Sequence, residues 1–169
     1  FPKSQKLEDA SFYAAKSHYM MSPVYSLDQE ETHTAIEKLQ IFMNNYPESK
    51  FTDECNQLIR KVQNKVEKKE FEVAKQYYTI YDYRAAIKSL DNFIAEFVGS
   101  KFREEALYYK FLASYEIAIN SIQSNKYQRL LDLRQLQNNI VRYYPETLFE
   151  EDLSKKMDKV EKEINIFAN

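Results

Sequence analysis

The sequence predicts an all-α fold, a tetratricopeptide-like α-solenoid of antiparallel helix pairs with overlong first helices. One motif occurs four times: an aromatic residue, Ser or Thr three positions later, and two acids at seven and eight positions. The copies begin at Phe1, Tyr46, Phe97 and Tyr144, which are 45, 51 and 47 residues apart. A period in this range is typical of stacked helical pairs. Turn residues are also scarce, with a single glycine, Gly99, and four prolines, which favours long helices and short joints.

The first helix is predicted from Leu7, Ala10, Ala14 and His18 or Met21, which recur at three- and four-residue steps until Ser22-Pro23. In each motif the residue in the proline slot ends one helix, and we expect the Ser or Thr after it to cap the next. The acidic pair then lies at the positive end of the helix dipole. The motif is thus interpreted as a signal that stops one helix and starts another.

The remaining helices follow in order. After a connector over residues 23–28, a second helix, capped by Asp28 or Thr32, runs to Tyr46. Residues 49–81 lack Gly and Pro and predict one helix of about 30 residues, roughly 45 Å long, whose apolar stripe is weakest over 66–73, where a break would fall. A joint near Asp82 leads to a helix ending at Phe97. A long helix from Lys101, a loop over 120–126, a helix returning to Tyr144 and a last helix complete the chain.

These elements predict one elongated helical-repeat domain over residues 1–169. Its repeats span about 1–46, 47–97 and 98–144, with a capping helix over 148–167 whose charged outer face suits the end of a solenoid. The first motif copy stands at residue 1, with no helix before it and no initiating Met. We therefore expect a chain cut from a longer protein, with an amino-terminal repeat and any lipid anchor lying upstream.

The second repeat follows tetratricopeptide spacing most closely. Ala74 and Tyr77 fall in its first helix, Tyr83 at the turn, and Ala86 where its second helix crosses closely. A small residue at that crossing lets two helices approach. Leu133 takes the corresponding place in the next repeat, so we expect that pair to cross at a larger distance.

The composition argues against several classes of function. The net charge of minus 2 gives no field suited to nucleic acid, and no apolar run reaches the 18 residues that indicate a membrane span. The only histidines, His18 and His33, fall on different predicted helices without metal-ligand spacing around them. Cys55 occupies a slot filled by Ala in sister copies, which favours a small buried side chain over a reactive thiol. We predict no enzyme activity, metal or cofactor.

The surface residues suggest protein binding. The basic stretch from Arg60 to Lys69 is interleaved with acids and is interpreted first as a solvated face, and second as a surface for an acidic partner. In the Tyr77-Tyr78 and Tyr108-Tyr109 pairs, one ring must pack between helices while its neighbour turns to the groove. The candidate partner-binding residues are Lys75, Tyr78, Tyr109 and Lys110.

Five segments together resemble the BamD (YfiO-type) family of outer-membrane assembly lipoproteins, which are tetratricopeptide-repeat proteins of Gram-negative bacteria, in its Bacteroidetes-like form. They are SPVYSLDQ at 22–29, AIEKLQIF at 35–42, YPESKF at 46–51, AKQYY at 74–78 and DYRAAI at 82–87. Each segment alone is only tetratricopeptide-like, but their order and the overlong first helices are more specific. The resemblance covers nearly the whole chain, as the second and later repeats of a five-repeat family.

This resemblance implies a non-catalytic scaffold subunit of the machinery that inserts β-barrel proteins. It would lie on the periplasmic face of the outer membrane, held there only by a lipid anchor outside this chain. The implied partners are proteins: BamA-like periplasmic domains, other assembly subunits and unfolded barrel clients. The alternative is a general periplasmic tetratricopeptide adaptor for envelope or peptidoglycan assembly.

Overall fold

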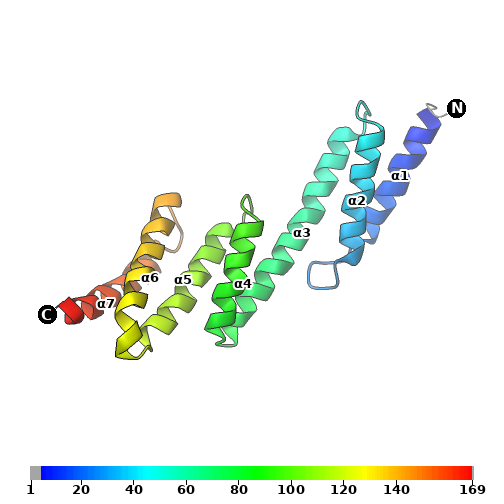
Figure 1. Cartoon of the computed structure of the whole chain (residues 1–169). Helices are drawn as coiled ribbons and strands as arrows, with labels where there is room; N and C mark the ends of the chain where they lie inside the picture. Colours follow the sequence, from blue (N-terminus) through cyan, green and yellow to red (C-terminus); the bar gives the residue numbers. More distant parts are fainter. Residues whose placement is uncertain (1–4, 169) are drawn as a thin grey trace. The chain divides into compact units, whose positions relative to one another are not determined.

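The computed structural model describes residues 5–168, which form seven helices and no strand. The helices are α1 (Gln5–Met21), α2 (Glu30–Asn45), α3 (Thr52–Thr79), α4 (Tyr83–Glu96), α5 (Arg103–Ile119), α6 (Gln123–Tyr143) and α7 (Glu150–Ala168) (Figure 1). The chain divides into two compact units, residues 1–69 and 70–169, so that α3 contributes to both. The predicted all-α, tetratricopeptide-like class with an overlong helix is confirmed. The motif copy at residues 1–4 lies outside the described residues.

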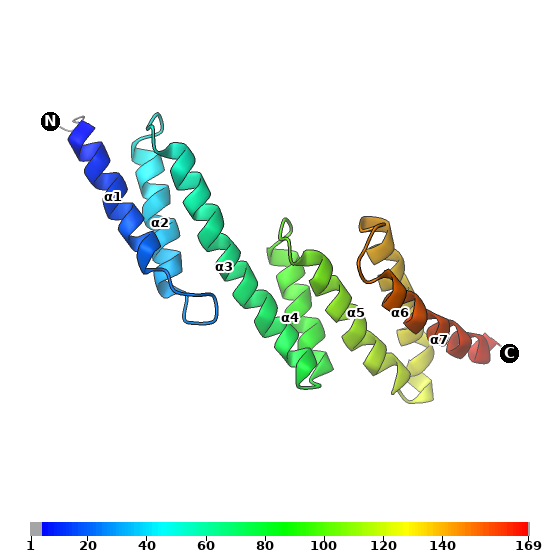
Figure 2. The same cartoon turned by 180° about the vertical axis from the view of Figure 1, so that it is seen from behind.

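The first unit packs α1, α2 and the first part of α3 around one apolar cluster. Figure 2 shows α1 and α2 side by side, joined by the connector that follows α1. The cluster consists of Phe12, Ala15, Leu39, Phe42, Cys55, Leu58 and Ile59. Cys55 is fully buried, which confirms the prediction of a small packed side chain at that position.

The buried face of α1 is not the apolar stripe from which this helix was predicted. Phe12 and Ala15 are buried, whereas Leu7 is 46% and Met21 is 57% exposed. The counterparts of Ala10 in later motif copies are Cys55, Ala106 and Leu153, and all three are buried. Ala10 is itself exposed, so a position that is buried in the sister helices is not buried in α1.

Three lysines of α3 hold the connector between α1 and α2. Lys65 Nζ donates to the backbone oxygen and the hydroxyl of Ser22, both at 3.0 Å. Lys69 Nζ donates to the carbonyl of Leu27 at 2.8 Å, and the Lys68 ammonium lies 4.0 Å from the ring centre of Tyr25. This part of the basic stretch is thus not the simple solvated face that the sequence suggested. The helix continues through residues 66–73 without the break that its weak stripe allowed.

The second unit packs the end of α3 with α4, α5, α6 and α7. One cluster consists of Phe71, Ala74, Ala86, Leu90, Phe93, Ala106 and Ala113. Another is built mainly from α5, α6 and α7, with Leu130, Leu133, Ile140, Leu153 and Val160 among its members. Asp82 caps α4 by accepting a hydrogen bond from the backbone N–H of Ala85 at 3.1 Å, as the predicted joint requires. The loop expected over 120–126 is shorter, because α6 begins at Gln123.

In the three motif copies that the structure describes, the hydroxyl stabilises a turn just before the helix and not the first helical turn that we predicted. Ser49, Ser100 and Thr147 each accept a hydrogen bond from the backbone N–H two residues later, at 3.2 to 3.3 Å. The helices then begin at Thr52, Arg103 and Glu150. The acidic residues do lie in the first turns of these helices, as expected from the helix dipole.

Candidate protein-binding site

Three of the four residues predicted to bind a partner lie together. Lys75 of α3 places its ammonium 4.7 Å from the ring centre of Tyr109 on α5. The rings of Tyr78 and Tyr109 meet edge to face with their centres 5.4 Å apart. All three side chains are half-buried, so each keeps a surface open to solvent.

The Lys75 ammonium also has an acidic neighbour. Its Nζ lies 2.9 Å from Oε1 of Glu105, which stands in the first turn of α5. Burial lowers the pKa of Lys75, but hydrogen bonds to Glu105 and Tyr109 outweigh it and raise the pKa above its ordinary value. Lys75 is therefore charged at neutral pH, and part of its charge is balanced within the protein.

Two tyrosines of this region, Tyr78 and Tyr108, are held in their protonated form. Burial, followed by the nearby charge of Glu116, raises the pKa of Tyr78. Burial and a hydrogen bond from its hydroxyl to Asp152 Oδ2, at 2.9 Å, raise the pKa of Tyr108. Tyr78 and Tyr108 are thus phenols at neutral pH, and neither is a phenolate.

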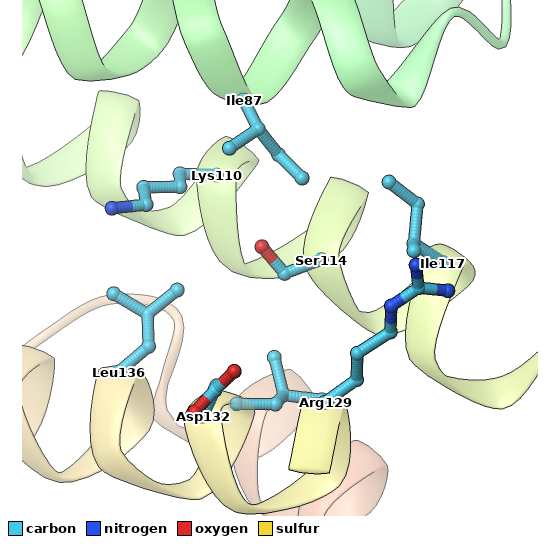
Figure 3. A pocket seen from close by; sticks show the side chains of 8 residues that line it. Ile87, Lys110, Ser114, Ile117, Arg129, Asp132 and Leu136 are labelled. Carbon is cyan, nitrogen blue, oxygen red and sulfur yellow. The ribbon is translucent and has the colours of Figure 1, made fainter. Parts of the chain in front are cut away.

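Lys110 is separate from the other three residues. It follows Tyr109 in sequence, and successive residues of a helix point about 100° apart. Its Nζ lies 2.5 Å from Oδ1 of Asp91, and its side chain lines a pocket between α4, α5 and α6 (Figure 3). The sequence offered Tyr109 or Lys110 as the contact from this helix, and the two side chains lie at different sites in the second unit.

The acidic pairs of the motif fasten successive repeats, a role that the sequence analysis missed. In two copies the first acid accepts a hydrogen bond from the hydroxyl of the next motif: Ser49 Oγ donates to Glu8 at 2.5 Å, and Thr147 Oγ1 donates to Glu104 at 2.7 Å. In the copies that begin at Tyr46, Phe97 and Tyr144, the second acid binds a residue in the preceding repeat. These second-acid contacts are Glu54 with Lys16, Glu105 with Lys75, and Asp152 with Tyr108.

A phenylalanine five positions into the motif completes this fastening. Phe51 stacks on Phe12 with ring centres 4.0 Å apart, and Phe149 stacks on Tyr108 at the same distance. Phe102 stacks on Phe71 at 5.5 Å. The signal was present in the sequence, because these three phenylalanines share one motif position. Lys16 and Lys75 each lie 5.5 Å from the ring centre of the phenylalanine four residues before them, so Lys75 has a structural counterpart in the first unit.

The histidines do not form a site with acids or cysteine. His18 lines a pocket of about 250 Å³ between α1 and α2, and its Nδ1 is buried without a hydrogen-bond partner among the described residues. His33 is exposed and does not line that pocket. Residues 5–168 contain no group of three or more His, Cys, Asp or Glu side chains arranged to hold a metal ion.

The remaining observations concern membrane-spanning segments and similarity to known proteins. Of the helices in the described part of the chain, none combines the length and apolar character needed to cross a bilayer. A protein-family model described as YfiO, outer membrane lipoprotein, matches the chain over residues 1–130 and again over residues 68–166. A search of curated proteins found no match.

Proposed function

Because the chain belongs to the YfiO outer membrane lipoprotein family, we propose that it is a non-catalytic scaffold subunit of the machinery that assembles β-barrel proteins in the outer membrane. Family membership itself associates the chain with that membrane. The finer proposal places it on the periplasmic face, held by a lipid anchor. Its partners there are BamA-like periplasmic domains, other assembly subunits and unfolded barrel clients.

The observation that carries this proposal is the family match over nearly the whole chain. The repeat architecture supports it, because helical repeats present extended surfaces on which other proteins dock. Contacts between neighbouring repeats within the second unit support a stable scaffold: Glu104 accepts a hydrogen bond from Thr147, and Glu105 pairs with Lys75. No catalytic step is assigned to the chain, since its two histidines lie on different helices and apart from any acid cluster.

Within the second unit, we propose that the cluster of Lys75, Tyr78 and Tyr109 contacts a partner. Tyrosine rings bury a large apolar area at little entropic cost and keep a hydroxyl for hydrogen bonding, which is why they are enriched at interfaces. The half-buried Lys75 adds a positive charge beside the ring of Tyr109. Lys110 would contribute from its separate place beside Asp91.

The test is direct binding between this protein and the purified periplasmic domains of the barrel-forming subunit from the same organism. Calorimetry is expected to give a saturable complex, and Tyr78→Ala together with Tyr109→Ala is expected to weaken it by about tenfold or more. Exposed Tyr143, on α6, provides the matched control variant Tyr143→Ala. Absence of binding to these domains would count against the scaffold role.

The alternative is a general periplasmic tetratricopeptide adaptor for envelope or peptidoglycan assembly. The same repeat surfaces would serve it, so the partner and not the fold separates the two. Cross-linking in intact cells, followed by identification of the linked subunits, distinguishes them. Links to peptidoglycan-assembly proteins without any link to the barrel-forming subunit would favour the adaptor.

A further inference from the structure

A pocket of about 280 Å³ lies in the second unit between α4, α5 and α6. Four of its lining side chains are apolar, namely Ile87, Ile117, Leu133 and Leu136, and four are polar, namely Lys110, Ser114, Arg129 and Asp132. Figure 3 shows Ile87 facing Leu136 and Asp132 across the opening, with Ser114 between them. The pocket is smaller than the 300 to 1,000 Å³ typical of sites that enclose a whole small-molecule ligand. Its size suits a single large side chain.

The apolar walls are not sealed by neighbouring side chains. Ile87, Ile117 and Leu136 are half-buried, and Leu133, in the middle of α6, is 1% exposed. An apolar group entering between them would remove further hydrocarbon surface from water, which is favourable in proportion to the area covered. The pocket therefore offers the same kind of contact that anchors a protein interface at its centre.

The two cations at the pocket differ in whether they have an acidic partner. Lys110 Nζ is paired with Asp91 at 2.5 Å. Arg129 donates to the hydroxyl of Ser121 and forms no ion pair with any carboxylate in residues 5–168. A guanidinium carries five donors in a planar fork that matches a carboxylate, so Arg129 keeps donors for an acid supplied from outside. Figure 3 shows its guanidinium reaching toward Ile117, at one side of the opening.

Asp132 sets where an incoming acid can lie. It is exposed, and its Oδ1 accepts a hydrogen bond from Gln128 Nε2 at 2.8 Å. Its charge opposes a second carboxylate on its own side of the opening. An acid is thus favoured next to Arg129 on the side of Ile117, close to the apolar walls and away from Asp132.

We propose that this pocket anchors a segment of a protein partner that carries one large apolar side chain with a carboxylate beside it. The apolar side chain lies between Ile87, Ile117 and Leu136, and the carboxylate binds Arg129. The proposal deepens the scaffold function and rests on it, because it states the chemistry that one docking surface selects. It is separate from the cluster of Lys75, Tyr78 and Tyr109, which lies between α3 and α5.

The test uses this chain with methyl-labelled Ile and Leu and two short capped peptides, in which a phenylalanine is followed by glutamate or by glutamine. The glutamate peptide is expected to shift the methyl signals of Ile87, Ile117, Leu133 and Leu136 in NMR spectra, and to bind about five- to tenfold more tightly than the glutamine peptide. Peptide binding without shifts at these methyls, or equal affinities for the two peptides, would overturn the proposal.

Variants separate the charge from the apolar contact. Arg129→Gln is expected to remove the preference for glutamate and leave the glutamine peptide unaffected, whereas Asp132→Asn is expected to increase that preference. Ser114→Leu should fill the pocket and weaken both peptides. Arg142→Gln is the matched control, since Arg142 is an exposed arginine on the same helix that does not line the pocket. An Arg129→Gln variant that keeps the preference would contradict the proposed role of Arg129.

Further outcomes distinguish the kind of ligand that occupies the pocket and separate this proposal from the scaffold function. Tighter binding of octanoate than of the glutamate peptide would assign the pocket to a small acid and overturn the protein anchor. If the peptides bind as expected but the periplasmic domains of the barrel-forming subunit do not, the proposed peptide-binding pocket is supported and the scaffold role is contradicted. If those domains bind equally well to the native chain and to Ser114→Leu, the scaffold role is supported and the proposed role of the pocket is contradicted.

Discussion

Thr147 donates a hydrogen bond from its hydroxyl to Oε1 of Glu104, at 2.7 Å, across 43 positions of sequence. The same hydroxyl accepts a hydrogen bond from the backbone N–H of Phe149 at 3.3 Å, and Thr147 is only 7% exposed. The two residues occupy the hydroxyl and first-acid positions of successive motif copies. The contact joins the start of α5 to the turn that precedes α7, so the motif determines the spacing of helices as well as their ends.

Replacing this hydroxyl by a methyl group should destabilise the protein. Thr147→Val keeps the shape of the side chain but leaves the N–H of Phe149 and the carboxylate of Glu104 without their partner. The expected loss is about 1 to 3 kcal/mol in the free energy of unfolding, measured by urea denaturation. Thr79→Val is the control at an exposed helix end, with a change expected within about 0.5 kcal/mol. Equal effects of the two variants would show that the contact contributes nothing specific.

The small residue at the crossing of α3 and α4 should resist enlargement. Ala86 is fully buried and packs in one cluster with Phe71, Ala74 and Leu90. Ala86→Leu must displace these neighbours, at an expected cost of about 1 to 3 kcal/mol as overpacking. Ala95→Leu makes the same change at an exposed position of α4 and should be nearly neutral. Thermal melts of the two variants provide the comparison, and an unchanged melting temperature for Ala86→Leu would contradict the predicted close crossing.

The second unit should lose stability in alkali through its tyrosines. Burial raises the pKa values of Tyr78, Tyr83, Tyr108 and Tyr115, and for Tyr108 the hydrogen bond to Asp152 adds to the effect. A raised pKa favours the protonated phenol in the folded state. That stability is complete below pH about 10, the ordinary pKa of tyrosine, and is lost as the pH rises toward the folded value, because the unfolded chain ionises first.

Tyr108→Phe tests the sign of this dependence. At pH about 7 the variant should be less stable by about 1 to 2 kcal/mol, since Asp152 loses a hydrogen-bond donor. As the pH rises above about 10, the difference from the native chain should narrow, because the variant has one fewer phenol to ionise. Urea midpoints at several pH values measure both. Tyr143 is 72% exposed, so the urea midpoint of Tyr143→Phe should change with pH in the same way as that of the native chain. The same pH dependence for Tyr108→Phe would contradict the stabilising role given to the Tyr108 phenol.

The ends of the helices were predictable because their causes are local. Tyr46, Phe97 and Tyr144 occupy the C-cap positions of α2, α4 and α6, as the motif predicted. A proline or its substitute after a helix acts within a few residues, and so does an acid at a helix start. The boundaries therefore follow from short stretches of sequence.

The partners of long side chains were not predictable, because they depend on which helices meet. Lys65 reaches the backbone of Ser22, which lies 43 positions away and offers no recognisable signal in the sequence. Leu7 and Met21 form an apolar stripe, but the position of α2 and α3 decides that Phe12 is the residue that packs. For the same reason, the sequence alone could not show that Lys75 and Lys110 lie at different sites. Their acidic partners, Glu105 and Asp91, lie on different helices.

Exchanging the charges of Lys75 and Glu105 separates a fastening role from a binding role. Lys75→Glu alone places two acids together, so it should lower both stability and affinity for the barrel-forming subunit's periplasmic domains. Lys75→Glu with Glu105→Lys restores an ion pair of opposite orientation between α3 and α5 and should recover most of the stability. If a partner contacts Lys75, affinity stays low in the double variant, because the charge offered to that partner is reversed.

The exposed pair Lys155 and Glu151 on α7 allows the same exchange as a control, with stability and affinity both expected to remain unchanged. Recovery of affinity together with stability would mean that Lys75 only fastens the repeats.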